Sequence, residues 1–104
     1  MTREAYFHSE ALQELYAAID WYDEQAMGLG DRFEVAVNDA METLRTWPTA
    51  GHAWSAADDA VRVFGLRGFN QSLVYVVADN RLTVLAVAHQ ARQPGYWEDR
   101  LGRS

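Results

Sequence analysis

The hydrophobic pattern of this chain changes near residue 60. Between residues 10 and 47 the large apolar side chains recur every three or four positions, which is the period of an α-helix. From residue 61 onward they form short, nearly continuous runs rich in valine, leucine, phenylalanine and tyrosine, which favour β-strands. The sequence therefore predicts an α+β protein with helices in its first half and a sheet in its second half.

Two amphipathic helices are expected before residue 48. The apolar stripe of the first consists of Leu12, Leu15, Tyr16, Ile19 and Tyr22, and the stripe of the second consists of Phe33, Val37, Ala40, Met41 and Leu44. Ser9 and Asp31 are suitable N-caps for the two helices, the segment 27–30 separates them, and Pro48 ends the second. The short connection predicts an antiparallel helix hairpin.

The strand pattern predicts the rest of one domain over residues 1–104. Residues 4–8 form a short first strand, residues 48–60 a surface loop, and residues 61–67, 72–78 and 82–89 an antiparallel meander. The Asp79-Asn80 connection suits the positive backbone angles of a tight hairpin. The expected order is β-α-α-β-β-β, with the helix hairpin packed on one face of an antiparallel β-sheet.

Charge and composition restrict the classes of function. Residues 1–60 carry twelve acids and three arginines, a net charge of −9, whereas residues 61–104 carry six arginines and three acids, a net charge of +3. The net charge of −6 and the absence of lysine argue against direct DNA binding by the chain alone. Without cysteine there is no disulfide or thiol nucleophile, and the apolar runs are too short to cross a membrane, so a cytoplasmic protein is expected.

The last quarter of the chain gathers the residues with functional chemistry. Directly after the last apolar run come His89, Arg92, Tyr96, Trp97 and Arg100. His89 suits a general base or a hydrogen-bonded residue that fixes the following turn. Arg92 suits a phosphate or carboxylate contact, shared with Arg62 if their strands are adjacent. Trp97 either stacks on a ligand or packs the turn onto the sheet, and the second alternative is favoured.

Several of these segments together resemble one known family. They are Phe33 after the 28–30 turn, Pro48 at the end of the second helix, Val61-Arg62, Val74-Tyr75 in the middle strand, and the ending from Val87 to Trp97. In this order and spacing they resemble the ParE branch of the RelE/ParE toxin superfamily. The resemblance implies the toxin of a bacterial type II toxin–antitoxin pair, bound and neutralised by a small antitoxin in a hetero-oligomer.

The resemblance also implies a choice between targets. ParE-like toxins poison DNA gyrase, and the residues expected to contact such a target are Arg62, Arg67, Arg92, Tyr96, Trp97 and Arg100. RelE-like toxins cut messenger RNA on the ribosome, and Arg62, His89, Arg92 and Tyr96 are the candidate catalytic residues in that case. The acidic, lysine-free composition favours the gyrase poison. The segment Asn70-Gln71-Ser72 departs from the ParE pattern and leaves a third alternative, an inactive homologue that only binds its antitoxin.

The partner surface is expected on the helices. Trp21, Tyr22 and Trp47 are candidates for an exposed aromatic patch that receives an amphipathic antitoxin helix, although aromatic side chains at helical spacing more often belong to the core. The acidic outer faces of both helices are expected to be solvated. The spacing of the three histidines matches no metal-binding pattern, and no nucleotide-binding loop is present, so neither a metal nor a cofactor is expected.

Overall fold

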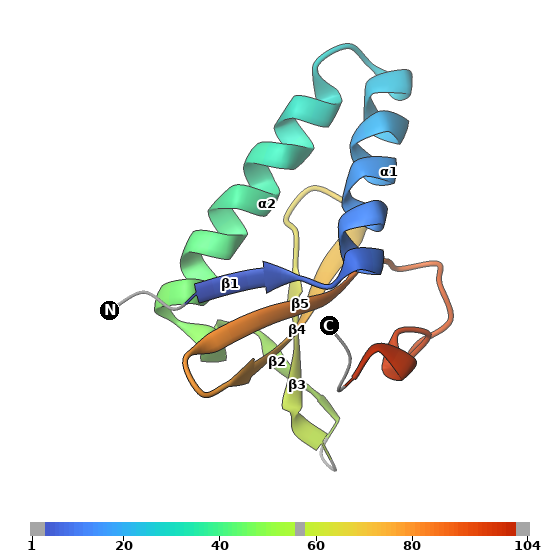
Figure 1. The fold of residues 1–104 in the computed structure, drawn as a ribbon. Coiled ribbons are helices and arrows are strands. Elements are labelled where there is room, and N and C mark those ends of the chain that lie inside the picture. The colour runs from blue at the N-terminus through green and yellow to red at the C-terminus, as the bar shows by residue number, and fades with distance from the viewer. Residues whose placement is uncertain (1–3, 56–57, 102–104) are drawn as a thin grey trace.

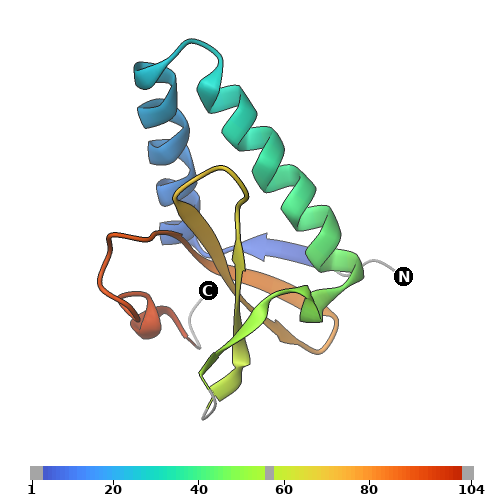
Figure 2. The same cartoon turned by 180° about the vertical axis from the view of Figure 1, so that it is seen from behind.

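The computed structural model describes residues 4–55 and 58–101, and Figure 1 shows the arrangement of their elements. In chain order these are β1 (Glu4–Phe7), α1 (Ser9–Gln25), α2 (Leu29–Thr46), the 3-10 turn η1 (Pro48–Ala50), β2 (His52–Ser55), β3 (Asp58–Gly65), β4 (Gln71–Ala78), β5 (Arg81–His89) and the 3-10 turn η2 (Glu98–Arg100). The two helices form an antiparallel hairpin over one face of the sheet, as the view from behind in Figure 2 also shows. The predicted α+β architecture is confirmed.

The strands form one five-stranded sheet in the order β1-β5-β4-β3-β2. The three pairs from β2 to β5 are antiparallel, which confirms the predicted meander, and β4 and β5 both lie inside the sheet. However, β1 pairs with β5 in parallel, so the sheet is mixed, and the prediction of a wholly antiparallel sheet was wrong in this pair. No tight hairpin joins β1 to β5, because the whole chain from α1 to β4 lies between them, and nothing local imposes an antiparallel direction.

The expected loop over residues 48–60 is largely ordered structure. It contains η1, β2 and the start of β3, while its residues 56 and 57 lie outside the described part. β2 pairs antiparallel with β3, with His52 opposite Val63 and Ala53 opposite Arg62. β2 has only four residues and one large apolar side chain, Trp54, so its sequence shows no alternation of apolar and polar residues. It is recognised as a strand only by its pairing with β3.

The helices begin differently from the sequence expectation. The cap of α1 is His8, whose Nδ1 accepts the Glu10 backbone N–H at 3.1 Å, and not Ser9. α2 begins at Leu29, before Asp31. The Gly30 N–H, which has no acceptor within the first turn of α2, donates to Oδ1 of Asp23 in α1 at 2.8 Å. A capping group therefore comes from the preceding helix rather than from the residue before α2.

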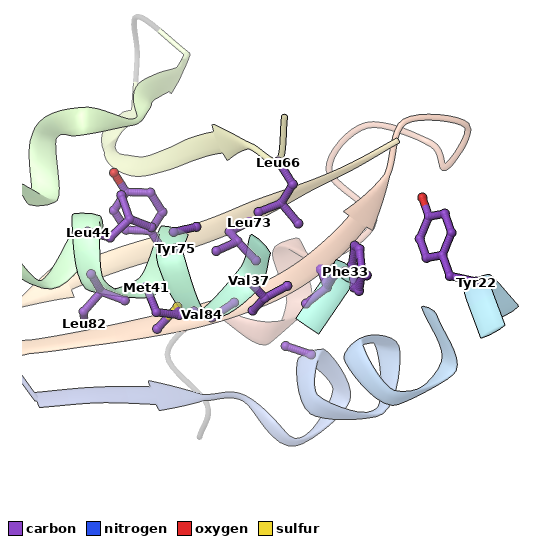
Figure 3. Packing of buried hydrophobic residues seen from close by; sticks show 13 residues of the cluster. Tyr22, Phe33, Val37, Met41, Leu44, Leu66, Leu73, Tyr75, Leu82 and Val84 are labelled. Atoms are coloured by element: carbon purple, nitrogen blue, oxygen red, sulfur yellow. The ribbon is translucent and has the colours of Figure 1, made fainter. Parts of the chain in front are cut away.

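The helix face of the sheet carries the larger apolar core (Figure 3). Phe33 and Leu44 of α2 are fully buried against Leu73 and Tyr75 of β4 and Leu82 of β5. These helix residues belong to the stripe predicted for the second helix, so that prediction is confirmed. In the first helix Tyr22 is buried, as its place in the stripe predicted, whereas Tyr16 is 57% exposed and its place in the stripe was wrong.

A smaller core lies on the opposite face of the sheet. It consists of Val61, Val74, Leu85, Ala86 and Trp97. A β-bulge shapes this face, because Val74 pairs with Ala86 and Tyr75 pairs with Val84, which leaves Leu85 without a partner across β4. The bulge turns both Leu85 and Ala86 toward Trp97, which returns to the sheet from the chain beyond β5.

Candidate functional site

The candidate site is built on the chain that follows β5, residues 90–101, here called the C-terminal turn. Successive backbone hydrogen bonds fold it, among them Arg92 N–H to His89 C=O at 2.9 Å, Tyr96 N–H to Gln93 C=O at 3.2 Å, and Glu98 N–H to Gly95 C=O at 2.9 Å. Gly95 has φ of +82°, and an added Cβ there would lie 2.7 Å from the Glu98 carboxylate, so the turn requires glycine. Nδ1 of His89 accepts the Ala91 N–H at 3.0 Å, which confirms that this histidine fixes the start of the turn.

Trp97 anchors the turn to the sheet. Its side chain is 2% exposed and packs on the smaller core, with its ring centroid 5.0 Å from that of Trp54 in an edge-to-face arrangement. The favoured alternative, that Trp97 packs the turn onto the sheet, is confirmed. Trp97, predicted as a target-binding residue, is therefore not among the exposed residues of the turn.

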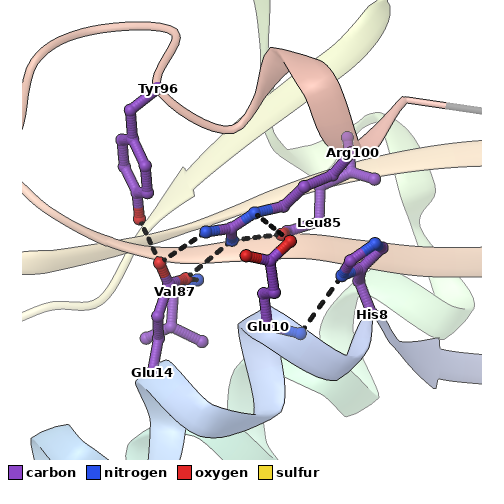
Figure 4. A network of polar contacts seen from close by, with 7 residues as sticks. All are labelled: His8, Glu10, Glu14, Leu85, Val87, Tyr96 and Arg100. Carbon is purple, nitrogen blue, oxygen red and sulfur yellow. Dashed lines mark hydrogen bonds and ion pairs between the residues drawn. The ribbon is translucent and has the colours of Figure 1, made fainter. Parts of the chain in front are cut away.

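A polar network on the other side of the turn connects it to α1 (Figure 4). We call it the Glu14 network; its members are Glu14, Leu85, Val87, Tyr96 and Arg100. Arg100 pairs with both carboxylate oxygens of Glu14 at 3.0 Å and donates to the Leu85 carbonyl at 2.8 Å. The Tyr96 hydroxyl donates to Glu14 Oε2 at 2.8 Å, and the Val87 N–H donates to Oε1 at 3.0 Å.

Arg100 is therefore a structural residue rather than an exposed contact. It is 6% exposed, and its guanidinium is occupied by a bidentate carboxylate pair and a backbone carbonyl. Arg100 was predicted as a target-binding residue, and the structure buries it. Like Trp97, it holds the turn in place from its buried side.

Tyr96 and Arg92 stack on each other at the surface of the turn. The Arg92 guanidinium lies 3.9 Å from the centre of the Tyr96 ring, a cation–π contact. Burial, and then the hydrogen bond to the Glu14 carboxylate, raise the pKa of the Tyr96 hydroxyl well above its ordinary value of 10.0. Tyr96 consequently remains protonated at neutral pH and serves as a hydrogen-bond donor rather than as a proton acceptor.

His89, Arg92 and Tyr96 form a wall shared by two small hollows. One, of about 160 Å³, extends toward Trp54, Val74 and Pro94 on the face opposite the helices. The other, of about 220 Å³, lies against Glu14, Ala17, Ala18 and Gln71 beside α1. The structure thus brings together three residues predicted from the sequence, His89, Arg92 and Tyr96. The exposed Arg92 guanidinium lies between the two partly apolar hollows.

The other two candidate arginines lie elsewhere. Arg62 of β3 donates to the Gly51 carbonyl at 2.7 Å and lines a separate hollow with Pro48 and Tyr75. It forms no clamp with Arg92, because β4 separates β3 from β5. Arg67 is exposed and lines a groove of about 720 Å³ between α2 and the end of β3. The predicted target-binding arginines therefore occupy three separate places.

The proposed aromatic patch does not exist as one surface. Tyr22 is 7% exposed, packs against Phe33 and Phe69, and donates its hydroxyl to Gln71 at 2.7 Å, so the prediction that it is exposed was wrong. Trp21 and Trp47 are exposed, at 51% and 67%. They lie near opposite ends of the antiparallel hairpin, because Trp21 is near the end of α1 and Trp47 follows the end of α2.

Glu14 is the important residue that the sequence analysis missed. It was assigned to the solvated acidic face of the first helix, yet it accepts hydrogen bonds from residues 73, 82 and 86 positions away in the chain. The sequence offered one signal, which is that Glu10 and Glu14 lie one helical turn apart on the same face of the helix. In the structure both of their carboxylates approach Arg100. The identity of their partner was not readable from that spacing.

In residues 4–55 and 58–101, no three histidine, aspartate or glutamate side chains gather as a set of metal ligands. Within the same ranges, no helix combines the length and the apolar character that crossing a bilayer requires.

Comparison with known proteins agrees with the geometry. Residues 5–94 match the family model described as the ParE toxin of the type II toxin–antitoxin system parDE. A solved structure titled "Chromosomal ParDE TA system from P. aeruginosa" superposes with a TM-score of 0.63 at 19% identity, covering 85% of this chain and 96% of that one, which indicates a shared fold. A search of curated proteins found no match. Because the family model spans most of the chain, the protein belongs to the ParE toxin family of type II toxin–antitoxin systems.

Proposed function

We propose that this protein inhibits bacterial growth by binding DNA gyrase in the cytoplasm, and that a cognate antitoxin neutralises it by forming a complex with it. Family membership supports the toxin class. The target and the neutralisation are the proposal, and the C-terminal turn is the surface to which we assign target binding. Arg92, Tyr96 and His89 are its contact residues, and Arg67 is an outlying candidate on the groove beside α2.

The observation that carries the proposal is the state of the four candidate catalytic residues. RNA cleavage through the ribose 2′-hydroxyl requires a proton acceptor and groups that stabilise the phosphate, all at one site. The Tyr96 hydroxyl is committed as a donor to Glu14, and its pKa is raised. Arg62 is held at Gly51, in a different hollow from Arg92. This distribution supports a toxin that acts by binding rather than by cutting messenger RNA.

For the antitoxin, the exposed tryptophans and the groove beside α2 support a helix-side surface. The groove is lined by Ala36, Ala40 and Thr43 of α2, and Trp47 follows one helical turn after Thr43. Large aromatic side chains left in water are typical of binding surfaces. We propose Trp47 as an antitoxin contact, Trp21 as a second one at the other end of the hairpin, and Tyr22 only as a packing residue behind Trp21.

The direct test is a gyrase supercoiling and DNA-cleavage assay with the purified protein, alone and with its antitoxin. Inhibition by wild type, weaker but measurable inhibition by Arg92→Ala, and reversal by the antitoxin are expected. Induced expression should arrest growth with a DNA-damage response. Unaffected gyrase together with cleaved messenger RNA on translating ribosomes would instead establish the ribonuclease. Absence of growth arrest would leave an inactive homologue that binds its antitoxin.

A further inference from the structure

The first observation is that β1 ends before its neighbour β5 does. β1 pairs with Arg81–Val84 of β5, and His8 N–H then donates to the Val84 carbonyl at 2.8 Å. In the described part of the chain, no strand lies beside β5 on this edge beyond Val84. Two side chains bond its backbone instead: Arg100 donates to the Leu85 carbonyl at 2.8 Å, and Glu14 accepts the Val87 N–H at 3.0 Å.

The second observation is that the Glu14 carboxylate is fully used. A carboxylate has about four acceptor positions. Oε1 accepts from Val87 and Arg100, and Oε2 accepts from Tyr96 and Arg100, at 2.8 to 3.0 Å. The Glu14 side chain is 18% exposed and that of Arg100 is 7% exposed. These charge-assisted bonds fix the Tyr96 hydroxyl relative to both α1 and β5.

The third observation is that the Tyr96 ring supports Arg92. The exposed Arg92 guanidinium lies 3.9 Å from the ring centre, between the two hollows of the candidate site. A free arginine side chain samples many rotamers, and ordering it on binding opposes association. A ring that is held at its hydroxyl restricts the guanidinium before any partner arrives.

We infer that Glu14 is a positioning residue for target binding, because it holds Tyr96, and Tyr96 in turn orients Arg92 toward the target. The inference rests on the proposed function, since it assumes that the C-terminal turn contacts the target. It assigns to α1 a role beyond covering the sheet. It also explains why a partly buried glutamate interacts with a tyrosine as well as with the arginine that neutralises it.

Glu10 provides a matched control on the same helix. Its carboxylate approaches the same guanidinium, at 3.6 Å from Nε of Arg100, but its side chain is 47% exposed. The hydrogen bond to the Tyr96 hydroxyl comes from Glu14. Glu10→Gln therefore perturbs the charge around Arg100 without removing the link to Tyr96. Tyr96→Phe removes the hydrogen bond to Glu14 and leaves the charges around Arg100 unchanged, because it keeps the ring and the Glu14–Arg100 pair.

The test has two arms. In the first, ¹⁵N relaxation of the Arg92 Nε–Hε group reports its motion on the picosecond-to-nanosecond timescale. We expect an ordered group in wild type and in Glu10→Gln, and a mobile group in Tyr96→Phe and Glu14→Gln. The thermal midpoint of Tyr96→Phe should fall by only about 4–8 °C, as expected for the loss of one hydrogen bond. An Arg92 that is equally mobile in wild type and in Tyr96→Phe would overturn the inference.

In the second arm, a double-mutant cycle measures gyrase inhibition. Tyr96→Phe should weaken inhibition about tenfold in the wild-type background, but less than about twofold when Arg92 is already alanine. Equal effects in both backgrounds would refute a role through Arg92 and would leave a direct target contact or a structural role for the Tyr96 hydroxyl. If wild type does not affect gyrase, the proposed function fails, and the relaxation arm still decides whether Glu14 and Tyr96 order Arg92.

Discussion

The two faces of the sheet are stabilised in different ways. On the helix face, a continuous apolar core joins both helices to the sheet, with fully buried residues such as Phe33 and Leu44. On the opposite face, the C-terminal turn is attached by one tryptophan and by the Glu14 network at its side. Apolar packing distributes stability over many contacts, whereas the turn depends on a few specific ones. The site proposed for function lies on the part with fewer attachments.

The largest effect is expected on the helix face. Phe33→Ala removes a fully buried ring that packs against Tyr22 and Phe69, and it should cost about 4–5 kcal/mol of unfolding free energy. Urea denaturation followed by circular dichroism measures this cost. Val35→Ala on the same helix is the control, because Val35 is 57% exposed and should change stability by less than about 0.5 kcal/mol. A small cost for Phe33→Ala would contradict the assignment of this core.

Trp97→Ala should have a smaller and more local effect. The loss of this ring costs about 3 kcal/mol in local stability, because the turn can detach while the helix-side core stays intact. Hydrogen exchange should accelerate in residues 90–101 and leave the amides of β4 protected. If β4 exchanges as fast as the turn, the two faces unfold together, and the proposed difference between them is wrong.

Glu14→Ala should follow in size. It leaves the nearly buried Arg100 guanidinium without its carboxylate partner, which costs about 2–3 kcal/mol, at the lower end for a buried pair because Glu14 is partly exposed. Chemical denaturation measures this cost. Glu10→Ala should cost less than about 1 kcal/mol, since Glu10 is about half exposed and meets Arg100 only at 3.6 Å. Equal costs for the two variants would contradict the central place of Glu14 in the network.

The pH dependence of stability should show the contribution of Tyr96. Its pKa is raised in the folded protein, so folding favours the protonated hydroxyl. This contribution is fully present below the unfolded-state value of about 10 and is lost as the pH rises further. Between pH 8.5 and pH 11, the unfolding free energy measured by chemical denaturation should fall less in Tyr96→Phe than in wild type. Identical losses would mean that the hydroxyl titrates normally in the folded state.

The smallest effect on stability is expected at Trp47. This side chain is 67% exposed, so Trp47→Ala should change the unfolding free energy by less than about 0.5 kcal/mol. If it contacts the antitoxin as proposed, titration calorimetry should show a loss of antitoxin affinity of at least about tenfold. Unchanged affinity would move the antitoxin surface away from this end of the hairpin. Thr46→Ala, at the exposed last residue of α2 beside Trp47, is the surface control.

The sequence predicted the elements with a regular pattern well and the irregular ones poorly. Both helices, the three long strands and the positive φ of Asp79 in the β4–β5 hairpin are confirmed. β2 was missed because four residues are too few to show a period. The parallel pairing of β1 was missed because it joins two strands that are distant in sequence. Both errors concern pairing partners, which local patterns do not encode.

The candidate site shows the same division. The cluster of His89, Arg92 and Tyr96 was visible because all three follow one strand within eight residues. The separation of Arg62 from Arg92 depends on the strand order, since β4 lies between their strands. The burial of Tyr22 beneath Phe69 depends on where the β3–β4 connection packs against the helices.

The sequence by itself determined the fold class, the two amphipathic helices and the presence of arginine and aromatic chemistry after the last strand, because these follow from periodicity and composition over short windows. Only the tertiary structure decided which of those residues are exposed. Arg100 and Trp97 hold the turn from its buried side, while Arg92 faces solvent. Glu14, near the other end of the chain, binds both Arg100 and Tyr96. The physical reason is that hydrogen bonds and burial depend on distances in space, and the partners that set them here are up to 86 residues apart.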